Sequence, residues 1–150
     1  MWTVKFSALT SSLTSNNVRF LGIDFGLKKI GLAIGDDSSG LAFPLEVIVG
    51  GDAAIPVILK LAKAESIDAL VVGVPYQSNP EHSSTQVDLT KKFIDLLASS
   101  TPLPIITADE KFSSSEARRM QQEFGVKAQE DAIAAQLVLQ AHLDDLRRLA

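Results

Sequence analysis

Short apolar runs separated by polar turns fill the first third of the chain after residue 17. The runs 18–24, 29–36 and 41–49 each have the length of a β-strand, and glycine, aspartate and serine cluster between them. Consecutive strands joined by such short turns pair as antiparallel neighbours. The pattern therefore predicts a three-stranded antiparallel meander.

Helical periodicity alternates with short apolar runs in the remainder of the chain. The predicted helices run from an N-cap at Asp52 to about Glu65 and over 84–98, 113–124 and 129–149, with strands at 69–74 and 105–108. Strands joined through helical crossovers lie parallel in a sheet. We therefore expect an α/β fold with a mixed sheet of five strands, in which the meander is followed by helix-linked strands and helices flank the sheet.

The two ends of the chain differ in character. Residues 1–17 are polar and lack periodicity, so we expect a loose N-terminal extension, with a targeting leader as the alternative, ahead of a single domain over 18–150. No apolar stretch approaches the roughly 20 residues of a membrane span, and the first residues lack the apolar centre of a secretory signal. We expect a soluble cytoplasmic protein with no membrane partner.

Composition restricts the chemistry of any metal site. The chain has no cysteine and only two histidines, whereas Asp and Glu together number 18. Oxygen ligands favour hard cations such as magnesium or manganese over zinc or copper. The formal net charge of −4 argues against a protein that coats nucleic acid by bulk attraction, so phosphate binding must depend on local clusters of Lys and Arg.

Acidic residues stand beside apolar sequence at three places. Asp24 ends the first predicted strand, where an uncompensated carboxylate would carry a desolvation cost of several kcal/mol. Asp109 and Glu110 follow the last predicted strand, and Asp131 shares a helix face with Ala135. Each place alone also has an ordinary structural explanation: a turn, a solvated loop or a favourable charge at a helix N-terminus. Carboxylates converging from separate elements instead favour divalent ions and phosphodiester hydrolysis.

Several blocks around these acidic residues occur together and in one order. They are Asp24-Phe25-Gly26, Ile30-Gly31-Leu32-Ala33, Val72-Gly73-Val74-Pro75, Asp109-Glu110-Lys111-Phe112-Ser113 and Asp131-Ala132. From about Phe20 to His142 the chain resembles the YqgF/RuvX family of Holliday-junction resolvases and pre-16S rRNA nucleases. The resemblance implies an RNase H-like fold and a nuclease in which Asp24, Glu110 and Asp131 hold two Mg²⁺ or Mn²⁺ ions. It leaves Asp109 as a candidate fourth ligand.

The resemblance also suggests partners. Lys28, Lys111 and Arg118 lie within or beside the acidic blocks and are candidates for binding substrate phosphates. The implied reaction is processing of the 5′ end of pre-16S rRNA in ribosome biogenesis, with ribosomal precursor particles as a further partner and the chain acting as a monomer or homodimer. The alternatives are a resolvase acting on branched DNA and a non-catalytic nucleic-acid-binding module. A third, an actin-like nucleotide-binding domain, normally needs two such domains.

Overall fold

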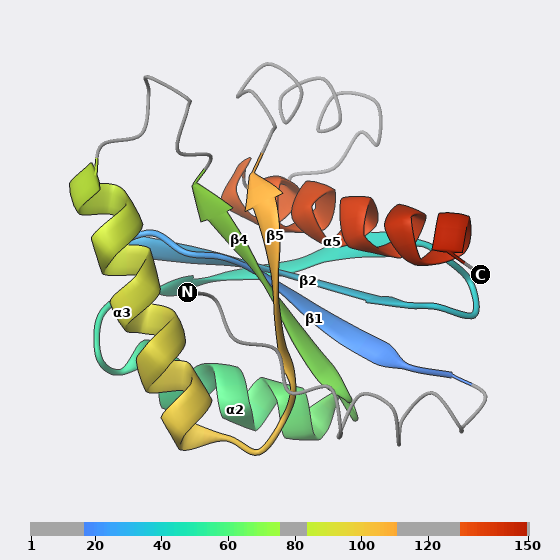
Figure 1. Cartoon of the computed structure of the whole chain (residues 1–150). Helices are drawn as coiled ribbons and strands as arrows, with labels where there is room; N and C mark the ends of the chain where they lie inside the picture. The colour runs from blue at the N-terminus through green and yellow to red at the C-terminus, as the bar shows by residue number, and fades with distance from the viewer. Residues whose placement is uncertain (1–16, 76–83, 111–129, 150) are drawn as a thin grey trace.

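The computed structural model describes residues 17–75, 84–110 and 130–149, and the side chains of Ser84 and Glu110 lie outside that description. The elements are β1 (Arg19–Asp24), β2 (Lys29–Asp36), β3 (Ala42–Val49), α2 (Ala54–Ala64), β4 (Ala69–Pro75), α3 (Ser84–Ser100), β5 (Ile105–Glu110) and α5 (Glu130–Leu149). The strands form one five-stranded sheet in the order β3-β2-β1-β4-β5 (Figure 1). The predicted α/β fold is confirmed.

The sheet joins an antiparallel half to a parallel half. β1 pairs antiparallel with β2, and β2 with β3, as expected for strands linked by short turns. β4 pairs parallel with both β1 and β5, so that Ile23, Val72 and Thr107 stand at one level of the sheet. The carboxyl ends of β1, β4 and β5 therefore meet at the same edge.

Helices cover both faces of this sheet. α2 and α3 lie on one face, and α5 crosses the other (Figure 1). The core against α2 and α3 is built from large side chains such as Leu21, Ile23 and Leu70. On the α5 side, the strands contribute mostly smaller residues, including Ala33 and Ala69. The smaller side chains therefore allow α5 to pack closer to the sheet than α2 and α3 do.

Two local predictions are wrong. Asp52 was expected to cap the first predicted helix, which is α2, but α2 has Ala53 as its N-cap residue with no side-chain cap. The backbone replaces that cap, because the Ala54 N–H donates to the carbonyl of Gly51 at 3.0 Å. The last strand also does not stop at residue 108: β5 continues through Asp109 and Glu110, since both pair with the extended end of β4.

Some predictions fall outside the described residues. These are the helix at 113–124 and, apart from Asn17, the N-terminal extension. In the described ranges, no helix has the length and apolar character needed to cross a membrane.

Candidate active site

The first acidic residue lies at the mouth of the β1–β2 hairpin. Phe20 to Ile23 are buried, while Asp24, the last residue of β1, is partly exposed. Its cross-strand partner is Gly31. Because side chains alternate along a strand, Asp24 shares the sheet face of Gly22, the face that α5 covers.

The start of α5 rests directly on that partner glycine. A Cβ atom on Gly31 would overlap the backbone carbonyl of Asp131, so only glycine leaves room for the helix there. Asp131 is half-buried, and the next residues, Ala132 and Ile133, are buried against the sheet. The contact places the first turn of α5 against β2 at Gly31, the residue paired with Asp24.

Glycines elsewhere under α5 let the helix stay close to the sheet. A Cβ on Gly22 would lie 2.8 Å from the Leu139 Cβ, and one on Gly73 would lie 2.9 Å from the Val138 Cγ2. Real Cβ atoms do not approach so closely without a shift of their neighbours. The helix axis is therefore fixed along β1 and β4 as well as at its start.

The two acidic residues of β5 occupy successive register positions. Asp109 pairs with Val74, whose side chain belongs to the core on the α2 and α3 side, and Asp109 itself is exposed. Glu110 pairs with Pro75 at the end of the strand, and its side chain is not described. The structure thus brings Asp24 and the backbone of Asp131 to the same face and edge of the sheet, and it places Asp109 on the other face.

Asp24 and Asp131 are the two acidic candidates that the described residues place at this edge of the sheet. No group of three or more His, Asp and Glu residues that would hold a metal ion occurs among the described residues. A third carboxylate would have to come from a side chain such as that of Glu110. The pair by itself is an oxygen donor set of the kind that hard divalent cations prefer.

The turn between β1 and β2 carries the described basic candidate. Lys28 is exposed there, as is Lys29, while Lys111 and Arg118 lie outside the described residues. The turn is anchored to the end of β3, because the Gly50 N–H donates to the Lys28 carbonyl at 2.9 Å. Gly26 serves this turn, since a Cβ there would lie 2.5 Å from the Lys29 carbonyl oxygen. Lys28 therefore stands on a turn whose backbone is held to the end of β3.

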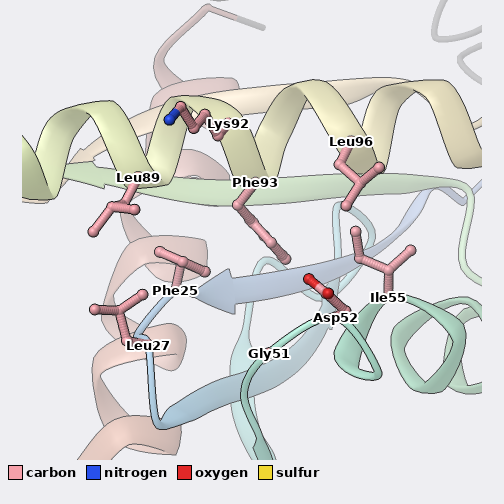
Figure 2. A pocket seen from close by; sticks show the side chains of 9 residues that line it. All are labelled: Phe25, Leu27, Gly51, Asp52, Ile55, Leu89, Lys92, Phe93 and Leu96. Atoms are coloured by element: carbon pink, nitrogen blue, oxygen red, sulfur yellow. The ribbon is translucent and has the colours of Figure 1, made fainter.

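The structure also shows a pocket that the sequence analysis missed. It lies beside the same turn, between the start of α2 and one face of α3 (Figure 2), and is lined by Phe25, Leu27, Gly51, Asp52, Ile55, Leu89, Lys92, Phe93 and Leu96. The rings of Phe25 and Phe93 stack with centroids 4.6 Å apart. The helical spacing of Leu89, Phe93 and Leu96 was the available signal, but spacing alone does not distinguish a core face from a cavity wall.

Solved structures resemble this arrangement of sheet and helices. RuvC of Thermus thermophilus matches with a TM-score of 0.57 and 14% sequence identity, covering 87% of this chain and 97% of that one. The fowlpox virus resolvase, solved with Holliday junction DNA, matches with a TM-score of 0.54 and 12% identity, covering 86% of this chain and 99% of that one. These likenesses define the class of fold, the RNase H-like α/β fold of the resolvases.

Sequence comparison then identifies the family. Residues 18–145 match the RuvX family, described as "Holliday junction resolvase", and the chain belongs to that family. A relative from Methylobacillus flagellatus is 37% identical over 134 residues, covering 84% of this chain and 90% of the relative. One from Rickettsia canadensis is 32% identical over 139 residues, covering 88% and 90%. Both are named "Putative pre-16S rRNA nuclease". The chain is a nuclease, a hydrolase of phosphodiester bonds in nucleic acid.

Proposed function

We propose that this nuclease is divalent-metal-dependent and processes the 5′ end of pre-16S rRNA, with Asp24, Glu110 and Asp131 as the metal ligands. The observation that carries the proposal is the close contact between the Asp131 backbone and Gly31, the residue paired with Asp24. Two carboxylates from distant parts of the sequence are thereby held at one sheet edge. The names of the two relatives support the choice of substrate.

The residues present fit a hard divalent cation such as Mg²⁺ or Mn²⁺. Asp24 and Asp131 are half-buried acids on the same side of the sheet edge, and like charges so placed favour a bound cation. Glu110 ends β5 at this edge, paired with Pro75 in the backbone register, and we propose it as the third ligand. When bound, such cations activate water and neutralise charge on the phosphate.

The remaining residues orient the nucleic acid. Lys28 projects from the anchored turn and is assigned to a substrate phosphate next to the scissile bond. Lys111 and Arg118 are proposed to contact further phosphates. Asp109 faces the α2 and α3 side, so we assign the metal site to three carboxylates and treat ligation by Asp109 as a point for experiment.

The direct test is cleavage of a pre-16S rRNA fragment by single variants in the presence of Mg²⁺ or Mn²⁺. Asp24→Asn, Glu110→Gln and Asp131→Asn should each lower the rate by more than the roughly 10–100-fold typical of losing an outer-shell partner. Asp109→Asn should act like Asp95→Asn, a control that removes an exposed carboxylate from α3. Full activity of Asp24→Asn would overturn the ligand assignment.

Branched DNA is the second candidate substrate, because the family carries the description Holliday junction resolvase. A four-way junction incubated in parallel with the rRNA fragment separates the two. Faster cleavage of the junction would replace the rRNA assignment while leaving the carboxylates in place. Binding of both nucleic acids in EDTA and in Mg²⁺, with cleavage of neither, would indicate a non-catalytic binding module.

A further inference from the structure

The pocket beside the β1–β2 turn has the dimensions of a site for one flat ring. Its volume is about 190 Å³. Apolar protein cavities of roughly 150 Å³ accept a benzene molecule, whereas sites for drug-sized ligands begin near about 300 Å³. A complete nucleotide cofactor is therefore too large, and a single heterocyclic base fits.

The walls of the pocket are apolar and partly open to solvent. Phe25, stacked on Phe93, forms the aromatic part of the lining, and Ile55 adds an aliphatic wall from the start of α2 (Figure 2). Leu27 and Leu96 line the same pocket and remain 64% and 50% exposed. Aliphatic side chains exposed together around a hollow favour an apolar occupant, because covering them removes unfavourable hydration.

The polar groups of the lining indicate which functional groups the bound molecule carries. Lys92 supplies one ammonium group, and Asp52 supplies a carboxylate left without a helix-capping role. Lys28 and Lys29 are exposed on the adjoining turn. An ammonium group suits a phosphate, and a carboxylate accepts hydrogen bonds from an exocyclic amino group of a base. An apolar pocket with one ammonium group and one carboxylate in its lining therefore suits the base and phosphate of a nucleotide within a strand.

The position of the pocket relates it to the reaction. Phe25 directly follows Asp24 and packs against the core on the α2 and α3 side, whereas Asp24 shares the face that α5 covers. The pocket and the carboxylate therefore lie on opposite sides of the same sheet edge. A strand that crosses the edge with one phosphate at Asp24 would carry a neighbouring nucleotide to the pocket. The occupant is thus a base flanking the scissile phosphate.

We propose that this pocket binds one unpaired nucleobase of the substrate strand, with Lys92 at the adjacent phosphate. The proposal rests on the proposed function in requiring a nucleic-acid substrate and in placing the scissile phosphate at Asp24. It assigns Leu27, Leu96 and Lys92 to substrate specificity, because a base held in a duplex cannot enter the pocket. The enzyme then selects substrates that are single-stranded beside the cleavage site.

The test measures binding in the Asp24→Asn background, so that cleavage does not enter the result. The probes are a labelled single-stranded RNA and the same RNA annealed to its complement. Leu27→Ser and Leu96→Ser should each weaken binding of the single strand about tenfold, within the range for loss of one base contact, and leave duplex binding unchanged. Lys92→Ala should weaken binding and reduce the slope of log affinity against log salt by about 0.7, the contribution of one single-strand phosphate contact.

Each control variant replaces the same type of residue as a pocket variant, at an exposed position outside the pocket. Lys91→Ala removes a neighbouring exposed lysine that does not line the pocket, and Leu149→Ser replaces a leucine that is 85% exposed at the end of α5. Melting temperatures of all variants check that each one folds. Pocket variants that bind single strands as tightly as these controls, or that lose single strand and duplex equally, would overturn the proposal.

The two proposals fail separately. If the unmodified chain cuts pre-16S rRNA and the pocket variants match the controls, the base pocket is wrong and the nuclease assignment stands. If pre-16S rRNA is not cut but the pocket variants lose single strands selectively, the substrate assignment is wrong and the pocket stands. Unchanged binding of every nucleic acid by the pocket variants would instead point to an apolar segment of a partner protein as the occupant, and would also overturn the proposal.

Discussion

The two faces of the sheet are built from residues of different size. On the α2 and α3 side, the strands present large side chains such as Leu21, Ile23 and Leu70. Under α5 they present Gly22, Gly31 and smaller residues such as alanine. Small residues allow a helix backbone to touch the sheet, whereas large ones hold the helices away. The face with less side-chain volume therefore fixes the position of α5 and of Asp131, and the pocket lies on the side of the bulkier face.

The largest expected effect comes from the carboxylate at the start of α5. Asp131→Asn should lower Mg²⁺-dependent cleavage by more than about 100-fold, because a ligand contributes more than an outer-shell partner. Its melting temperature should change little, since the side chain is only half-buried. Initial rates over a range of Mg²⁺ concentrations measure the effect. Retention of the unmodified rate would separate α5 from the active site.

A smaller effect on rate should follow when the close contact of α5 is relaxed. Gly31→Ala forces the Asp131 carbonyl away from β2, and overpacking of this kind costs typically about 1–3 kcal/mol of stability. We expect the rate of cleavage, measured well below the melting temperature, to fall about 10–100-fold, which is the effect typical of losing a residue that holds a metal ligand in place.

Leu143→Ala provides the control for that comparison. Leu143 is 1% exposed on α5 and packs in the same core, so its truncation should cost about 2–5 kcal/mol without moving the first turn of the helix. Cleavage by the folded fraction should stay near that of the unmodified chain. Equal losses of activity in Leu143→Ala and Gly31→Ala would mean that stability alone explains both.

Substitutions in the core on the α2 and α3 side should change the stability of the protein rather than its rate of cleavage. Leu70→Ala removes a fully buried side chain from β4 and should lower the free energy of unfolding by about 2–5 kcal/mol. The rate of cleavage by folded protein should remain within a few-fold. Urea denaturation and single-turnover kinetics give the two quantities. A large change in rate at unchanged stability would show that this face also sets the active-site geometry.

The smallest expected effect is a dependence of stability on pH from His142. Burial lowers the pKa of His142 below 6.5, and its ring contacts Phe20 edge-on with centroids 5.1 Å apart. The unfolded chain therefore takes up a proton first as pH falls through about 6.5, and stability decreases there until the lower folded-state pKa is passed. His142→Phe should reduce this decrease, measured by urea denaturation between about pH 7 and 5. An identical pH profile in the variant would exclude His142 as its source.

Sequence patterns predicted the elements well because their signals are local. The meander over 18–49 and the last helix follow from apolar periodicity and turn residues, and the observed boundaries differ by one residue at most. The failures at Asp52 and at the end of β5 have a different origin. At the helix start, the Gly51 carbonyl three residues before Ala54 takes the place of the expected side-chain cap. The end of β5 depends on pairing with the end of β4, whose position no local pattern specifies.

The sequence by itself determined the donor chemistry: carboxylates without cysteine, at strand and helix ends, in the order of a nuclease family. Only the tertiary structure decided which of them meet. Strand register placed Asp109 on the face opposite Asp24, and the absence of a side chain at Gly31 allowed the backbone of Asp131 to approach the strand partner of Asp24. The physical reason is that alternation and close packing act between segments about a hundred residues apart, where residue type alone specifies no neighbour.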